Sequence, residues 1–206
     1  MNQIKSFFEN ILNMKYTGGS DVHQYSVEKL LQENGFTHSV NLFYGSISKK
    51  ERDAALSGGS LDSLQNGEYI SQPCGSQESP DFIVKYNDKI YFIECKSSEK
   101  TGPTWNSCYP QINYIYIFTS KKYNETTIFR GEDVLFDEKR KLYTELLNKQ
   151  NLILEEFRKN PIWQKDSRGF DYYTRDMYTQ SGTSDKTDYF KHADRKMCEQ
   201  NVLNSL

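Results

Sequence analysis

The sequence has no apolar stretch near the roughly 18 residues that a membrane-spanning helix needs. Its N-terminus lacks the basic segment and apolar run of a secretory signal. The 4 cysteines show no C-x-x-C spacing, which favours reduced thiols over a disulfide framework or a zinc site. These absences predict a cytoplasmic protein that does not associate with membranes.

Two further absences narrow the chemistry. The 3 histidines, His23, His38 and His192, are scattered among unlike segments, which gives little support to a histidine-based nuclease or a zinc centre. No G-x-x-x-x-G-K-[ST] loop occurs, so ATP-driven translocation is not expected. The net charge of −2 gives no general attraction to nucleic acid, so any DNA contact must come from a local cluster of basic side chains.

The chain is long enough for one hydrophobic core, and it is rich in aromatic residues. At 206 residues it can bury one domain well, and a second independent core is not expected. The 15 tyrosines and 12 phenylalanines supply rings for a core, an interface or nucleotide stacking.

Hydrophobic periodicity predicts an alternation of helices and strands. Helices are expected over residues 2–14, 21–34, 49–56 and 132–159, extended segments over 36–44, 82–86, 90–95, 112–119 and 126–129, and loops over 60–79 and 97–111. We expect a domain core over about residues 20–160 and a C-terminal recognition or dimerisation extension over about 161–206.

The most informative segment is a predicted β-hairpin with a two-residue turn at Asn87 and Asp88. This turn pairs Phe82 with Ile93 and brings Asp81 opposite Glu94. Directly opposed side chains lie about 4.5–5.5 Å apart at Cβ, and two carboxylates at that distance repel unless a cation or a proton lies between them.

Strand alternation adds an amine to this pair of acids. Lys96 lies on the same face as Glu94, whereas Cys95 points into the opposite layer. Oxygen ligands with open positions suit Mg²⁺ better than Zn²⁺, and Mn²⁺ is expected to substitute. In such a site the metal polarises a phosphate and Lys96 orients or deprotonates a water. The carbonyl of Cys95 is a further candidate ligand.

Pro80, Asp81, Glu94 and Lys96 together resemble the signature of the PD-(D/E)xK nuclease superfamily, and within it a type II restriction endonuclease. The resemblance is close over residues 80–96 and weaker over 97–118. It implies an α/β fold with a central mixed sheet flanked by helices, and Mg²⁺-dependent cleavage of double-stranded DNA. It also implies a homodimer acting on a palindromic sequence, with a cognate DNA methyltransferase in the same system.

The same resemblance suggests secondary candidates. Glu28, on the second predicted helix, is a further candidate metal ligand. Candidate DNA contacts after the catalytic strand are Trp105, Asn106 and Gln111. In the C-terminal extension the candidates follow from side-chain chemistry, since guanidinium groups can read guanine edges and phenols can contact phosphate: they are Arg168, Tyr172, Tyr173 and Arg175. Each candidate also has a plain structural interpretation. In that interpretation Glu28 is a solvated helix carboxylate and the segment around Trp105 is a connector whose tryptophan covers the core. The C-terminal extension is then a solvated tail or a dimer arm.

Two other functions remain open. One is a structure-specific nuclease of the same superfamily, similar to a junction resolvase. The other is a non-catalytic DNA-binding module that kept the fold. The intact trio of Asp81, Glu94 and Lys96 favours an enzyme.

Overall fold

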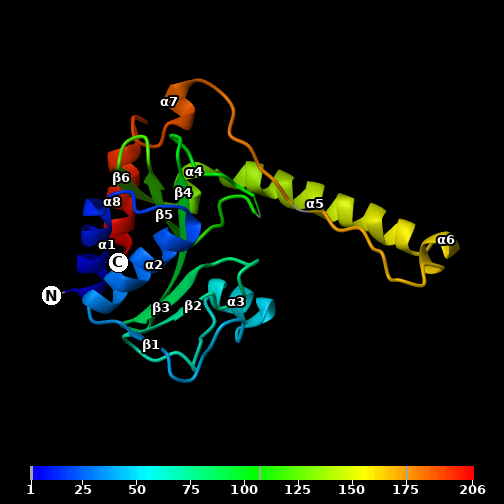
Figure 1. Ribbon diagram of the computed structural model, residues 1–206, viewed down its shortest axis with the longest axis horizontal. Helices are drawn as coiled ribbons and strands as arrows, with labels where there is room; N and C mark the ends of the chain where they lie inside the picture. Colours follow the sequence, from blue (N-terminus) through cyan, green and yellow to red (C-terminus); the bar gives the residue numbers. More distant parts are fainter. Residues whose placement is uncertain (1, 107, 175) are drawn as a thin grey trace.

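The computed structural model describes residues 2–106, 108–174 and 176–206, and within these ranges the chain forms a six-stranded mixed sheet flanked by helices (Figure 1). The strands are β1 (Thr37–His38), β2 (Glu68–Ser71), β3 (Phe82–Tyr86), β4 (Lys89–Ser98), β5 (Tyr114–Ser120) and β6 (Glu125–Arg130), and they lie side by side in chain order. Two neighbouring pairs, β1 with β2 and β4 with β5, are parallel, and the other three are antiparallel. The expected α/β class with a central mixed sheet is therefore confirmed.

Helices cover both faces of the sheet. They are α1 (Gln3–Asn13), α2 (Ser20–Glu33), α3 (Lys49–Leu56), α4 (Gly131–Val134), α5 (Asp137–Arg158), α6 (Pro161–Gln164), α7 (Ser184–Thr187) and α8 (Arg195–Ser205). On one face α1, α2 and α8 pack on aliphatic side chains such as Ile93 and Ile117. On the other face α3 and the connecting loops pack on aromatic side chains such as Phe92 and Tyr116. The two layers follow the alternation of side chains along β4 and β5.

The predicted hairpin has the predicted register. Phe82 pairs with Ile93, Val84 with Tyr91 and Tyr86 with Lys89, as antiparallel partners. Asn87 and Asp88 form the turn, and both have positive φ angles of 48° and 61°. Asparagine and aspartate tolerate this left-handed conformation better than most residues, so the turn residues set the register.

Two predicted segments differ from the structure. The segment 60–79, expected to be a loop, contains β2, whose buried Tyr69 and Ile70 pair with β3. A four-residue strand among glycine, serine and glutamine is too short to show a period of two. The expected strand over 36–44 is reduced to β1, which has two residues.

The long helix predicted over 132–159 is interrupted. It is divided into α4 and α5, because Leu135 is extended, with φ of −131°, and buries its side chain against the domain. α5 then runs away from the sheet as a protruding arm (Figure 1), and none of its 22 residues is buried.

The core also differs from the expected range of 20–160. α1 contributes Ile4, Phe7 and Phe8 to it and α8 contributes Val202, whereas α5 lies outside it. Both termini therefore belong to the folded body. No helix in the described part of the chain has the length and apolar character needed to cross a bilayer.

Candidate active site

The hairpin brings the two predicted carboxylates together. Asp81 directly precedes β3 and Glu94 lies in β4, one position beyond the pair formed by Phe82 and Ile93. Both are buried, with 7% and 6% of their surface exposed. Buried carboxylates need partners, so their contacts define what the site can hold.

Three donors hold the carboxylate of Asp81. The main-chain N–H of Cys95 donates to Oδ2 at 2.7 Å, and the side-chain amides of Gln24 and Gln72 donate to Oδ1 at 2.7 and 3.0 Å. Burial and the nearby Glu94 nevertheless raise the pKa of Asp81 to about 8. The repulsion expected from the register is thus present, and a proton or a cation relieves it.

Glu94 is only half satisfied. Its Oε1 accepts from Lys96 Nζ at 2.9 Å, whereas Oε2 is buried and has no hydrogen-bond partner among the residues that the structure describes. Burial alone would lower the pKa of Lys96, but the Glu94 carboxylate outweighs that effect and the pKa is raised. Lys96 is therefore a cation, and it also lies 5.8 Å from the centroid of the Trp105 ring.

These side chains line one open cleft with about 1290 Å³ of empty space that is continuous with solvent. Asp81, Glu94 and Lys96 contribute to it, and so do Gln24 from α2 and Asn106 from the loop after β4. The rest of the lining is mostly serine, glycine and glutamine. It also includes Glu78 and Glu99, whose charges are paired with Lys49 and Lys121. A neutral polar wall of this kind admits an anionic group beside the lysine.

The site fits a hard divalent cation that keeps water ligands. Within the described ranges no three His, Cys, Asp or Glu side chains are grouped to hold a metal, so Asp81 and Glu94 are the available pair. Oε2 of Glu94 accepts no hydrogen bond from the described part of the chain, so it is available as an oxygen ligand. Mg²⁺ is bound in many proteins by one or two carboxylates, with water and phosphate filling its other positions.

The remaining candidate ligands are placed apart from this pair. Glu28 accepts a hydrogen bond from the Tyr69 hydroxyl at 3.0 Å and lines a neighbouring pocket, so α2 presents Gln24 to Asp81 instead. Gln24 lies one helical turn before Glu28, so the two side chains share a face of α2. That spacing is the only sequence feature that could have indicated Gln24 as a site residue. The Cys95 thiol points into the aliphatic layer, as predicted, and the contact of Cys95 with the site is through its main chain.

The three candidate DNA contacts after β4 have different positions. Asn106 lines the cleft. Trp105 is 2% exposed and donates through Nε1 to Gln180 Oε1 at 3.0 Å, so it is a core residue and the expected DNA contact is wrong for its ring. Gln111 donates through its side chain to the Tyr109 carbonyl at 2.9 Å and lines a different pocket.

The C-terminal candidates lie far from the cleft. Arg168, Tyr172 and Tyr173 are exposed in the segment that follows α6 at the far end of the arm and returns along α5 (Figure 1). Arg175 lies outside the described residues. A recognition role for this segment stays a prediction.

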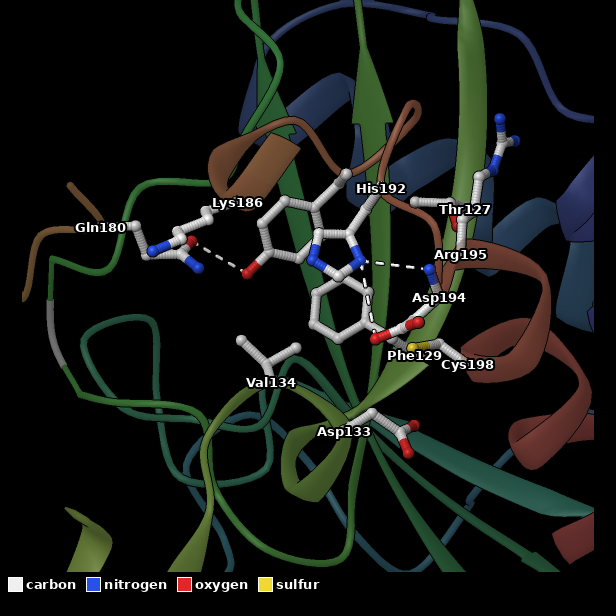
Figure 2. A pocket seen from close by; sticks show the side chains of 11 residues that line it. Thr127, Phe129, Asp133, Val134, Gln180, Lys186, His192, Asp194, Arg195 and Cys198 are labelled. Atoms are coloured by element: carbon white, nitrogen blue, oxygen red, sulfur yellow. Dashed lines mark hydrogen bonds and ion pairs between the residues drawn. The ribbon is translucent and has the colours of Figure 1, made fainter. Parts of the chain in front are cut away.

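A second cavity, of about 530 Å³, lies beside β6 and α8 (Figure 2). Several of its polar side chains are paired with one another or with the core: Gln180 Oε1 accepts from Tyr189 at 2.9 Å, and Arg195 pairs with Glu199 at 2.8 Å. Because these groups stabilise the C-terminal segment, the cleft at Asp81 is the better candidate site.

Comparisons of the chain with family models, with curated proteins and with solved structures found no match. The functional interpretation therefore depends on the geometry of the cleft.

Proposed function

We propose that this protein is a Mg²⁺-dependent endonuclease of the type II restriction class, with a restriction-endonuclease-like fold, which hydrolyses double-stranded DNA at a short sequence. The observation that supports this most is the pair of buried carboxylates, Asp81 and Glu94, beside the cationic Lys96 in an open cleft. A structural ion pair would need one acid for one base. The second carboxylate needs a proton or a further cation, and the Glu94 oxygen that has no partner among the described residues is available to bind the cation.

Asp81 and Glu94 would hold the ion, with the Cys95 carbonyl as a further candidate ligand. Bound Mg²⁺, or Mn²⁺ in its place, would polarise the phosphate and lower the pKa of a water ligand. Gln24 and Gln72 keep the Asp81 carboxylate in one orientation, which reduces the reorganisation needed on binding.

Lys96 acts on the phosphate or the water as an ammonium group. Its raised pKa favours the charged form, which offsets the negative charge that develops as water oxygen adds to phosphorus. The bond from phosphorus to the 3′ oxygen breaks, the water gives up a proton and the 3′ oxygen takes one up. The products are a 3′ hydroxyl and a 5′ phosphate.

The proposal includes a homodimer on a palindromic site and a companion methyltransferase that protects host DNA. The near-neutral chain supplies little general attraction for DNA, since the net charge is −2. Affinity is therefore expected to come from local contacts along the cleft, where Asn106 is the best placed of the predicted residues.

The test is digestion of an unmethylated plasmid by the purified protein, with Mg²⁺ and with chelator, followed by sequencing of the ends. Discrete fragments with 5′ phosphates, lost in Lys96→Ala, support the proposal. Lys89→Ala is the matched control, because Lys89 is an exposed lysine in the same hairpin. Preference for branched DNA would instead indicate a resolvase-like enzyme, and DNA binding without cleavage would indicate a non-catalytic module.

A further inference from the structure

The protruding arm carries apolar surface that the described chain does not cover. Four side chains along α5, Leu142, Leu146, Ile153 and Phe157, are 64%, 49%, 56% and 58% exposed. At 100° per residue they fall within about 60° of one another around the helix axis, which makes a narrow stripe. A coiled-coil seam has this width.

The arm is a defined element and not a loose end. At its base the Arg140 guanidinium donates to the carbonyls of Leu135 at 2.6 Å and Gly131 at 3.2 Å, and to that of Pro110. Near its tip Arg158 pairs with Asp171 at 2.8 Å. Arg140 joins α5 to the folded body, and Arg158 joins it to the returning segment. Both arginines lie about 100° or more around the helix axis from the stripe, so these contacts leave the stripe open.

The charge of α5 does not favour nucleic acid as the occupant. The helix contains five basic and five acidic residues, so its net charge is zero. A DNA-binding helix gains its affinity from an excess of positive charge. An uncharged helix with an apolar stripe is typical of a protein contact.

We propose that the stripe of α5 binds the same stripe of a second copy of this chain, in an antiparallel arrangement. The spacing of the four side chains is 4, 7 and 4 residues, which reads the same in both directions. In an antiparallel pair Leu142 therefore faces Phe157 of the other copy and Leu146 faces Ile153. A two-fold interface requires this kind of self-complementary surface.

The centre of the stripe is compatible with such a pair. Lys149 lies there, and its Nζ binds Glu145 of its own helix at 2.6 Å. The charge of Lys149 is thus directed to the flank of the stripe. The two central lysines of a dimer need not meet.

The exposed area is adequate for a dimer. Each stripe side chain offers on the order of 100 Å² of apolar surface, so two arms supply roughly 800 Å² from the stripes alone. Stable interfaces bury about 1,200–2,000 Å² in total. Ile162, which is 79% exposed at the tip, and the carbon chains of the polar side chains that flank the stripe can provide the remainder.

This inference deepens the proposed function, because it names the surface of the expected homodimer, but its test needs neither DNA nor metal. The solution mass of the purified chain is measured by analytical ultracentrifugation at about 1 to 100 µM protein, a range that brackets typical affinities. We expect the native chain to have twice the monomer mass and the Leu146→Glu, Ile153→Glu double variant to be monomeric. Replacement of two side chains at the centre of the interface should raise the dissociation constant of the dimer at least about 100-fold.

Leu152→Glu is the matched control. Leu152 is 70% exposed on the same helix but lies off the stripe, so this variant should remain dimeric. All three substitutions are at unburied positions, which removes failure to fold as an explanation. A monomeric native chain, a dimeric double variant, or a monomeric Leu152→Glu variant would each overturn the proposal. A monomeric native chain would point to a different protein on the stripe.

Disulfide trapping tests the direction of the pair. A mixture of Leu146→Cys and Ile153→Cys chains should form a cross-linked dimer on mild oxidation, and Ile153→Cys alone should not exceed the native background. In a parallel pair Ile153→Cys would cross-link to itself, which would refute the antiparallel arrangement. The native chain is the control for its own 4 thiols.

Discussion

Gln24 donates from Nε2 to Oδ1 of Asp81 at 2.7 Å, across 57 positions of sequence. Gln72 donates to the same oxygen and to the side-chain carbonyl of Gln24, at 3.0 and 2.8 Å. The two amides therefore form a clamp that orients a buried carboxylate. Gln24 is a positioning residue for the proposed metal site.

Replacement of Gln24 by alanine should reduce cleavage about 10- to 100-fold, as small errors in orientation do. The Mg²⁺ concentration for half-maximal activity should rise, because Asp81 loses a fixed orientation. Gln32→Ala is the control, since Gln32 lies on the same helix but donates to Tyr69 at 2.8 Å. Equal activity and metal dependence in both variants would remove Gln24 from the site.

Mg²⁺ should raise the thermal midpoint of the native chain, because it binds the folded carboxylate pair and not the unfolded chain. At 100 times its dissociation constant the ion would add about 2.7 kcal/mol to the free energy of unfolding. Asp81→Asn should abolish this shift while Asp88→Asn, in the hairpin turn, keeps it. Calorimetry with and without Mg²⁺ measures the thermal midpoint of each variant. An Asp81→Asn variant that Mg²⁺ stabilises as much as the native chain would contradict the assignment of Asp81 as a ligand.

His23 should make the protein sensitive to mild acid. Burial lowers the pKa of His23 from 6.5 to about 4, although its contact with the Ile117 carbonyl, at 3.3 Å, partly opposes this. The unfolded chain therefore binds the extra proton first. The contribution of neutral His23 to stability is present above pH 6.5 and is lost as the pH falls towards 4.

The expected loss over that interval is about 3 kcal/mol in the free energy of unfolding. Denaturant titrations at pH 7 and pH 4.5 measure it. His23→Gln should show a smaller pH dependence than the native chain, while His38→Gln, at an exposed position, should resemble the native chain. An unchanged pH dependence in His23→Gln would show that another group is responsible.

Arg140→Ala should loosen the arm at its base, because three main-chain carbonyls lose a charged donor. Limited proteolysis should then cut between α4 and α5 faster than in the native chain. Arg168→Ala, at an exposed position on the returning segment, is the comparison. Equal cleavage rates would mean that packing alone holds the arm.

The hairpin could be predicted from sequence because its information is local. A two-residue turn with asparagine and aspartate sets the register, and the register places Asp81 opposite Glu94. The face shared by Glu94 and Lys96 then follows from the pleat. Nothing distant in the chain is needed for these steps.

The other parts of the site depend on distant contacts. Gln24 reaches Asp81 because α2 packs across β4, and Gln72 reaches it through a short strand with little pattern of its own. The burial of Trp105 depends on Gln180, 75 positions later. A tryptophan between a catalytic strand and a polar loop gives no local sign of whether it faces DNA or the core. The hydrophobic periodicity over residues 132–159 predicts a helix there, but it cannot say which partner covers the apolar stripe of α5.

Trp105 also makes the end of the chain part of the folded body. Its indole N–H binds Gln180, and its main-chain carbonyl accepts from the Tyr178 N–H at 2.8 Å. A shortened protein ending before these residues would leave a polar group of the indole without an acceptor beneath the lysine of the cleft. Anyone designing a smaller version for crystallography should therefore delete from the tip of the arm and keep the last thirty or so residues.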